Sequence, residues 1–512
     1  MAEQLLTGPV RESAREPARR RLPAGAVFGA SFAVLLTLLL VRDTGVFTMH
    51  VAERGDSAAN SIIVAQAKHF RLLVGNYSRI GFSHPGPAFF YVFALGEWLG
   101  YDVLGALPSP YNGQWLAALA LNAALVAAAL TILWTWSRSW RAWLWAAAAA
   151  LAFLGTHDNV LTSTWMPFVY VAPFLLFLTA AASVAAGRTA HLWLLALAGG
   201  LLVHGHAEFL LLFVPATALA VLAALRYGRP RPPFVARHWP AAGAVVALFL
   251  LPMVLNLVLH WPGEYGKYLG YGGHHASSHG LGADLRYFGW FWLPQPLLGV
   301  LLAVAGPAAG LLLARRQPYG ESRRFLTAGV GTVALAGLLF AGYVVRGIDV
   351  LLPYVGYFFW AAPLLLLMLL VTGAAGLLPR GRPGTVLPVV ALAAALVFAG
   401  VSPAVPSTPE HLRAGPGVIR AVAAYGRGRP AVLSLDHDSW PEMTALLIDG
   451  ERAGQRVCVR DRSWQFIVTS QMVCGAREIE TGVPVTLATQ PGGELVSVSF
   501  GGRVMSLPTG SD

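Results

Sequence analysis

The sequence predicts an all-α polytopic membrane protein with about eleven transmembrane helices, followed by a small C-terminal α/β domain outside the membrane. Three observations lead to this prediction. Of the 512 residues, 56% are hydrophobic and only 12% are charged. Long apolar runs recur throughout residues 24–403, and beyond Val405 prolines and charged residues separate short β-rich runs. A soluble protein cannot bury this much apolar side chain, so we expect a bilayer to solvate part of it.

Eleven apolar runs are long enough to cross the hydrocarbon core of a bilayer, which is about 30 Å thick. They begin near Ala24, Gly113, Trp140, Pro167, His191, Ala207, Pro240, Trp290, Leu326, Leu351 and Thr385. A further run over residues 85–104 carries Glu97, Asp102 and three glycines. This composition predicts a helix lying at the membrane interface rather than a further span.

The distribution of basic residues predicts the orientation. Eighteen arginines, from Arg11 to Arg382, lie in the N-terminal tail and in the loops on its side of the membrane. The opposite loops hold eight Lys or Arg before the C-terminal domain, from Arg42 to Arg346. The arginine-rich side is expected to be the cytoplasm, and an odd number of spans places the C-terminus outside the cell (plasma) membrane. Because these residues form no continuous patch, the net charge of +11 indicates topology and not nucleic-acid binding.

The pattern divides the chain into three parts. Residues 1–23 are expected to be a disordered basic cytoplasmic tail. Residues 24–403 form the transmembrane domain, whose first run resembles a retained signal anchor because no small-residue cleavage site follows it. Residues 404–512 form the extracytoplasmic domain, with a predicted strand, helix and strand at Ala431–Leu435, Pro441–Asp449 and Arg456–Val459.

The two cysteines of the chain, Cys458 and Cys474, both lie in the C-terminal domain. Outside the membrane such a pair is expected to form a disulfide. A free pair or metal ligands remain the alternatives, although no zinc-type spacing supports metal binding.

The outer loop over residues 42–112 is the longest connection between predicted spans and is rich in polar residues. Within it, residues 58–70 have the apolar pattern of a short helix lying on the membrane, with Gly55 and Asp56 at its start. Asp56 is expected either to cap this helix or to have a catalytic role. Ionisable groups gathered beside a membrane mark a candidate site.

The order of motifs in this loop resembles that of the GT-C superfamily of membrane glycosyltransferases, in particular the branch of protein O-mannosyltransferases and aminoarabinose transferases. These enzymes have an acidic motif just after the first span, a juxtamembrane helix, and a His or Lys followed by prolines and an aromatic helix. This chain has Glu-Arg-Gly-Asp at residues 53–56, the helix over 58–70, and Ser-His-Pro-Gly-Pro-Ala-Phe-Phe-Tyr at residues 83–91. It departs from the pattern at Ser57, where a second carboxylate is common, and at Gly86, where a second proline is usual.

The resemblance implies transfer of a sugar from a polyprenyl-phosphate donor to an extracytoplasmic glycan, lipid or protein, with inversion. Asp56 would be the general base and Glu53 a second carboxylate. Before the tenth span, Arg346 and Tyr354 resemble the family's Arg-Tyr-Leu-Pro pattern beside the lipid phosphate. His84 and Arg79 would orient the loop or bind phosphate. A divalent cation stays open as a cofactor, since the sequence requires none.

Arg346 taken alone suits two interpretations. Arginine presents a planar fork of donors to phosphate oxygens, but it also snorkels as an interfacial anchor at helix ends.

Three other polar clusters are predicted on the outer side. His157 and Asp158 would supply a second carboxylate, position the acceptor, or form a solvated turn. Residues 204–208 include His204, His206 and Glu208, which suit ordinary hydrogen-bonded polar residues better than metal ligands. The histidines at 274, 275 and 279 lie among Gly and Ser, as in a mobile lid or a flexible loop.

Two other functional classes compete with the enzyme. A transporter or flippase of a lipid-linked or polar substrate would share the polar outer loops, but corresponding interrupted spans are not found. A sensory protein with a partner-binding outer domain would leave the first loop without a function. Only the enzyme requires Asp56, His84 and Arg346 to face one cavity.

Overall fold

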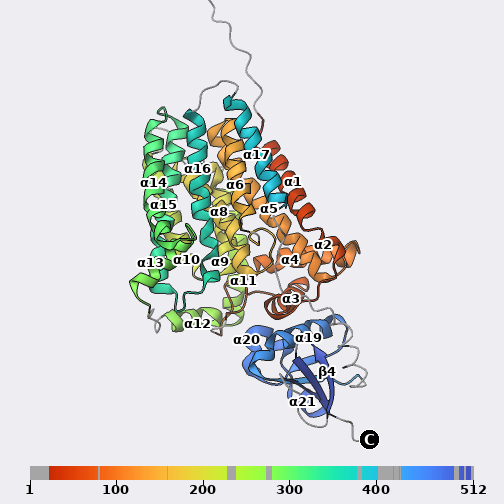
Figure 1. The fold of residues 1–512 in the computed structure, drawn as a ribbon. Coiled ribbons are helices and arrows are strands. Elements are labelled where there is room, and N and C mark those ends of the chain that lie inside the picture. Colours follow the sequence, from red (N-terminus) through yellow and green to blue (C-terminus); the bar gives the residue numbers. More distant parts are fainter. Residues whose placement is uncertain are drawn as a thin grey trace, which may run out of the picture.

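The protein forms a helical bundle with a small α/β domain at one end, as the computed structural model in Figure 1 shows. The structure describes residues 22–78, 81–157, 159–227, 238–272, 279–377, 383–401, 419, 422, 426, 428–488, 495–500 and 503–508. Helices α1 and α17 lie together on one side of the bundle, and α13, α14 and α15 lie on the other (Figure 1). The predicted tail at residues 1–23 lies almost wholly outside the described residues.

The helices of the bundle follow one another along the chain, and a long connection over residues 69–87 separates α3 from α4. In order they are α1 (Ala24–Arg42), α2 (Gly45–Thr48), α3 (Gly55–Lys68), α4 (Ala88–Glu97), η1 (Trp98–Val103), α5 (Pro110–Ser137), α6 (Trp140–Gly155), α7 (Met166–Val169), α8 (Val171–Ala185), η2 (Thr189–His191), α9 (Leu192–Gly205), α10 (Phe209–Tyr227), α11 (His238–Leu259), α12 (Gly263–Gly272), α13 (Leu281–Trp290), α14 (Pro296–Arg316), α15 (Glu321–Gly347), η3 (Pro353–Trp360), α16 (Ala361–Leu377) and α17 (Pro383–Val401).

Within the described part of the chain, nine helices are long and apolar enough to cross a membrane, and two shorter apolar helices cover 140–155 and 189–205. Together they correspond to the eleven predicted runs. The eighth run differs at its start, because α13 ends at Trp290 and the span begins only at Pro296. Pro294 and Pro296 explain the break, since proline cannot continue a helix from within but is favoured in its first turn.

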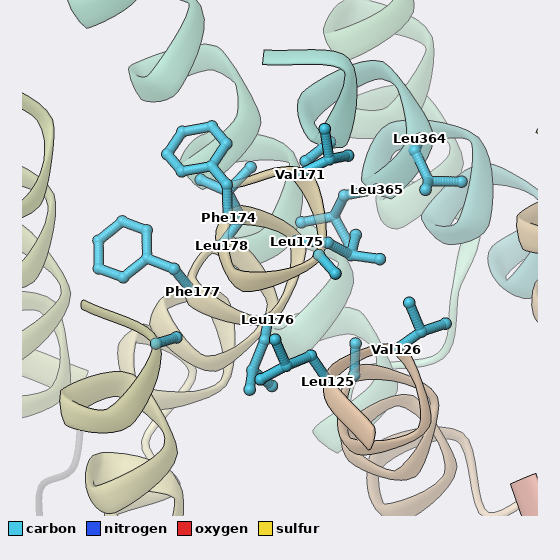
Figure 2. Close-up of a cluster of buried hydrophobic side chains, with 14 of the residues drawn as sticks. Leu125, Val126, Val171, Phe174, Leu175, Leu176, Phe177, Leu178, Leu364 and Leu365 are labelled. Atoms are coloured by element: carbon cyan, nitrogen blue, oxygen red, sulfur yellow. The ribbon is translucent and has the colours of Figure 1, made fainter. Parts of the chain in front are cut away.

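Helix α8 forms the centre of the bundle. It is apolar on all sides, and each residue from Val171 to Val184 is buried. A helix of this composition needs apolar neighbours around its whole circumference. Figure 2 shows Leu175 of α8 near Leu365 of α16 and Leu176 of α8 near Leu125 of α5, while Phe174 points to the other side of the helix.

The C-terminal domain contains a five-stranded sheet in the order β2-β1-β3-β5-β4. The strands are β1 (Ala431–Leu435), β2 (Val457–Val459), β3 (Val483–Ala488), β4 (Leu495–Phe500) and β5 (Arg503–Pro508). β1 pairs in parallel with β2 and β3, whereas β5 pairs antiparallel with β3 and β4.

The predicted strand, helix and strand are confirmed, because α19 (Trp440–Arg452) connects β1 to β2. Short helices η4 (His437–Ser439), η5 (Arg462–Trp464), α20 (Gln465–Val468), η6 (Ser470–Met472) and α21 (Ala476–Thr481) complete the described part of the domain. The predicted disulfide is present, with an S–S distance of 2.09 Å between Cys458 and Cys474.

Helix α3 differs from the expected interfacial helix. It lies between the bundle and the C-terminal domain (Figure 1), and ten of its fourteen residues are buried. Ile63, Val64 and Ala67 join the core of the bundle, whereas Ile62 and its neighbours join the core of the C-terminal domain. The sequence prediction missed this second contact because the C-terminal domain covers the face that was expected to meet lipid.

Candidate functional site

A cavity of about 450 Å³ lies where α3, the start of α10 and the end of α15 meet. The residues from these elements include Asp56 and Asn60 of α3, Phe209 of α10, and Tyr343 of α15. Its remaining wall is made of loop residues around 76–84 and 165–167, and of residues 347–358. The cavity therefore collects side chains from most of the outer loops that were predicted to be polar.

Asp56 lines this cavity and has a donor for each carboxylate oxygen. The hydroxyl of Tyr77 donates to Oδ1, and the indole Nε1–H of Trp165 donates to Oδ2 at 2.9 Å. A carboxylate has about four lone-pair directions, so these two bonds fix its orientation and leave further acceptor capacity. The arrangement holds a basic oxygen in place beside an open cavity.

The local backbone explains why glycine precedes Asp56. Gly55 has φ +57°, a left-handed conformation that residues with a Cβ rarely adopt. The chain therefore turns sharply at Gly55, the first residue of α3. Asp56 is expected as a cap in one of the two sequence interpretations, but Arg54 occupies the N-cap position, and no side chain makes a capping hydrogen bond there.

A short hairpin carries Tyr77 and His84 into the cavity wall. The amide of Gly75 donates to the carbonyl of His84, and the amide of His84 donates to the carbonyl of Asn76, both at 2.7 Å. Two residues of helix α12 bind this hairpin at Ser83. The Ser83 amide donates to Glu264 at 2.6 Å, and the Ser83 carbonyl accepts the hydroxyl proton of Tyr268.

Burial, followed by the nearby His206 ring, lowers the pKa of His84 well below its ordinary value. Its Nδ1 accepts the amide proton of Ala207 at 3.4 Å. His84 is therefore a neutral ring that orients the hairpin by hydrogen bonding, and carries no charge at neutral pH.

Opposite Asp56, the cavity has a second acidic group, Glu208. Burial, and then the Asp349 carboxylate, raise the pKa of Glu208 to about 8. The Tyr343 hydroxyl donates to Glu208, and His206 Nδ1 lies 3.4 Å from its Oε2. Burial lowers the pKa of His206 to about 4, so at neutral pH a protonated carboxyl faces a neutral imidazole.

Two side-chain amides also face the cavity. The Oδ1 atoms of Asn60 and Asn76 are buried and have no hydrogen-bond partner among the residues that the structure describes. Asn60 stands one helical turn after Asp56 on α3 and is only 6% exposed. A ligand hydroxyl entering the cavity would satisfy these groups.

Several predicted site residues do not line the cavity. Glu53 forms a two-pronged ion pair with Arg452 of the C-terminal domain, at 2.6 and 2.7 Å. His157 stacks on Phe153 at 4.1 Å and is not a lining residue. Arg79 and Asp158 lie outside the described residues.

Arg346 is exposed at the end of α15, one residue before Gly347, which lines the cavity. Tyr354 does line it, with its ring 5.4 Å from that of Trp165. Of the three residues that the enzyme interpretation requires at one cavity, Asp56 and His84 lie in the wall, whereas Arg346 is not a lining residue.

Sequence reasoning gave no role to Tyr343 or Asp349, and treated Glu208 as an ordinary polar residue. Asp349 follows Arg346 closely in an outer loop, which was the available signal. Tyr343 lies within an apolar run and offered none. Of the other outer histidines, His279 binds Asp284 at 2.5 Å, and residues 274 and 275 lie outside the described part.

His204, at the end of α9, does not line this cavity, although His206 does. Its ring lies against Gly86, where an added Cβ would come within 2.3 Å of the imidazole. This contact gives a reason for glycine at the position where the resembling family usually has proline. The ring also accepts the amide proton of Ala88 at 3.3 Å.

A second, apolar cavity of about 1000 Å³ has His204, Pro87 and Ala88 in its lining. It extends along α1, α5, α9 and α11, from Ala24 and Phe28 to Phe70 and Leu72. Its length follows α5 from Leu121 to Thr135 and α9 from Trp193 to His204, and α1 contributes only its first residues.

Among the described residues, no group of three or more His, Cys, Asp or Glu side chains is arranged to hold a metal ion.

The arrangement of helices is similar to that of an oligosaccharyltransferase from Archaeoglobus fulgidus. Its crystal structure in complex with Zn and sulfate has a TM-score of 0.43 and 12% identity, over 90% of this chain and 68% of that chain. The apo form has a TM-score of 0.38 and 12% identity, over 86% and 65%. No family model matches the sequence, and no curated protein does. So weak a likeness carries no argument about activity, which depends on the site itself.

Proposed function

We propose that this chain is a membrane glycosyltransferase of the GT-C type that transfers a sugar from a polyprenyl-phosphate donor to an extracytoplasmic acceptor. One observation carries the proposal. The Asp56 carboxylate, held by Tyr77 and Trp165, faces a cavity at the end of a membrane-spanning bundle. A fixed carboxylate beside a substrate-sized cavity is what general-base catalysis requires.

In the proposed reaction Asp56 takes the proton of an acceptor hydroxyl as its oxygen attacks the anomeric carbon of the donor sugar. The bond between that carbon and the phosphate oxygen breaks, and polyprenyl phosphate leaves with the electron pair. A single displacement of this kind inverts the anomeric configuration. Glu53 has no part in this step, since its carboxylate is paired with Arg452.

The leaving phosphate needs donors beside the cavity. We assign this role to Arg346, with Tyr354 in the cavity wall and the protonated carboxyl of Glu208 as a neutral donor. Arginine suits a phosphate because its planar fork stays charged and binds two oxygens. Arg79 and Asp158, which lie outside the described residues, stay predicted contributors, whereas His157 does not line the cavity and has no assigned part in this step.

The apolar cavity supports a lipid-linked donor. Its lining is almost wholly aliphatic and aromatic. His84 lines the polar cavity, and Pro87, Ala88 and His204 line the apolar one, so one short segment of the chain contributes to both. A polyprenyl chain lying along α5 and α9 would bring its phosphate to the end of the apolar cavity near His204. The proposed orientation, with the cavity and the C-terminal domain outside the cell membrane, agrees with the disulfide.

Lipid extraction from the purified protein, with mass spectrometry of the extract, tests the donor class. We expect a polyprenyl phosphate or its sugar conjugate to co-purify, and the purified protein to transfer the sugar covalently to a hydroxylated acceptor. Uptake of a lipid-linked substrate into proteoliposomes without formation of any glycosidic bond would contradict the proposal and favour a transporter.

A further inference from the structure

The C-terminal domain makes two ion pairs with the residues just before Asp56. The two terminal nitrogens of Arg452, Nη1 and Nη2, donate to the Glu53 carboxylate at 2.7 and 2.6 Å. Arg54 in turn binds Glu442 of α19. The carboxylates of Glu53 and Glu442 are only 1% and 0% exposed, so each is enclosed where the two parts of the chain meet.

Hydrogen bonds and apolar contacts extend this surface along α3. The Thr444 hydroxyl has two possible acceptors, the Gly55 carbonyl at 3.2 Å and the Pro441 carbonyl at 2.9 Å. At the other end of the helix, Gln66 donates to Thr469 at 2.8 Å. Ala58, Ala59 and Ile62 belong to the same buried cluster as Met443, Leu446 and Leu447 of α19.

A polar network connects the same surface to the bundle. Ser61 donates to Glu53 at 2.9 Å, and its hydroxyl is also 3.1 Å from the amide nitrogen of Gln114 on α5. Gln114 binds Glu97 of α4 at 2.8 Å, and Lys68 binds the same carboxylate at 2.9 Å. The start of α3 is thus held between α4, α5 and the C-terminal domain.

We infer that the C-terminal domain is a positioning element for the cavity, with Arg452, Glu442 and Thr444 holding residues 53–55 so that Asp56 meets its two donors. The inference depends on the proposed role of Asp56 as the base. Arg452 is a positioning residue, since it contacts Glu53 and does not line the cavity.

The geometry of Gly55 makes this control necessary. Gly55 adopts φ +57° between the paired residues and Asp56, and glycine is the residue with the greatest backbone freedom. Because Gly55 has no side chain, its backbone dihedral angles are restricted by its neighbours, and the ion pairs of Glu53 and Arg54 fix those neighbours. A displacement of about 1 Å at a catalytic group costs up to roughly a hundredfold in rate.

Arg452→Met in the full chain tests the inference, with Arg456→Met as the matched control. Arg456 makes an equivalent pair with Glu478, at 2.6 and 3.2 Å, within the C-terminal domain. We expect Arg452→Met to lower kcat roughly tenfold or more with little change in the donor KM, whereas Arg456→Met keeps kcat. Arg452→Lys should restore part of the loss, because it keeps the charge.

A readout independent of activity is the ¹⁹F resonance of Trp165 in protein labelled with 5-fluorotryptophan, assigned by its loss in Trp165→Phe. Trp165 donates directly to Asp56, so its resonance reports the position of that carboxylate. We expect it to shift in Arg452→Met and in the volume-conserving Thr444→Val, and to stay in place in Arg456→Met.

An unchanged Trp165 resonance together with an unchanged kcat in Arg452→Met would overturn the inference. A shifted resonance in a protein that transfers no sugar even as wild type would support the positioning and reject the proposed function. The two ideas therefore fail separately.

Discussion

The indole Nε1–H of Trp165 donates a 2.9 Å hydrogen bond to Asp56, although 109 residues separate them in the chain. Trp165 precedes α7, whereas Asp56 lies in the first turn of α3. We predict that Trp165→Phe lowers kcat roughly tenfold, because a hydrogen bond to a charged group contributes about 1.5–3 kcal/mol. Tyr357→Phe is the control, since Tyr357 does not line the cavity. Equal rates in both variants would show that the orientation of Asp56 is not limiting.

Much of the fold was predictable because each span carries its own signal. The eleven runs, the strand-helix-strand unit at 431–459 and the disulfide depend on local hydropathy, periodicity and cysteine placement. Asp56 and His84 were also identifiable, since they belong to a motif with a fixed order.

The partners of these residues could not be predicted in the same way. Glu53 stands three residues from Asp56, yet the turn at Gly55 directs it to Arg452, 399 residues away. Glu208 and Asp349 meet through the packing of α10 and α15, and no spacing in the sequence expresses that packing. Long-range contacts of this kind appear only in the folded chain.

The orientation predicts which exposed sites an impermeant thiol reagent can reach in intact cells. Ser463 of the C-terminal domain and Ser322 at the start of α15 are both exposed in the structure. We expect Ser463→Cys to be labelled and Ser322→Cys to be labelled only after the membrane is permeabilised. The opposite pattern would place the cavity in the cytoplasm and remove the basis for an outer acceptor.

The raised pKa of Glu208 predicts how stability changes with pH. Between pH 6.5 and 8 the folded protein holds this proton, with a pKa of about 8, while an unfolded Glu has lost it. The folded state therefore binds more protons, and stability falls as the pH rises through this window. The lowered pKa values keep His84 and His206 neutral in the folded state, whereas an unfolded histidine is half protonated at about pH 6.5. These rings therefore oppose the effect of Glu208 at the lower end of the window and contribute little near pH 8.

Thermal unfolding across this pH window provides the measurement. In Glu208→Gln the titrating group is absent, so we expect the Tm of the variant to depend less on pH than that of the wild type. Parallel Tm profiles for the two proteins would contradict the assigned protonation state.

Asn60 offers a test that separates binding from folding. Within the described part of the chain its buried Oδ1 has no partner, so Asn60→Leu should leave the Tm unchanged or raise it, while raising the KM of a hydroxylated substrate. Asn122→Leu is a suitable control, because Asn122 donates to the Leu161 carbonyl at 3.0 Å outside the cavity. We expect that variant to lower the Tm and leave KM unchanged. A lowered Tm with normal KM in Asn60→Leu would mean that Asn60 has only a structural role.

The most direct measurement is the rate of sugar transfer by Asp56→Asn, compared with the wild type, using a confirmed polyprenyl-phosphate donor. Asparagine keeps the size of the side chain and one carbonyl oxygen, which can still accept from Trp165, while its NH2 group can donate to the Tyr77 hydroxyl, but it is no longer a base. We predict a normally folded and inserted protein whose transfer rate is lower by roughly two or more orders of magnitude. A wild-type rate in Asp56→Asn would contradict the role of Asp56 as the catalytic base.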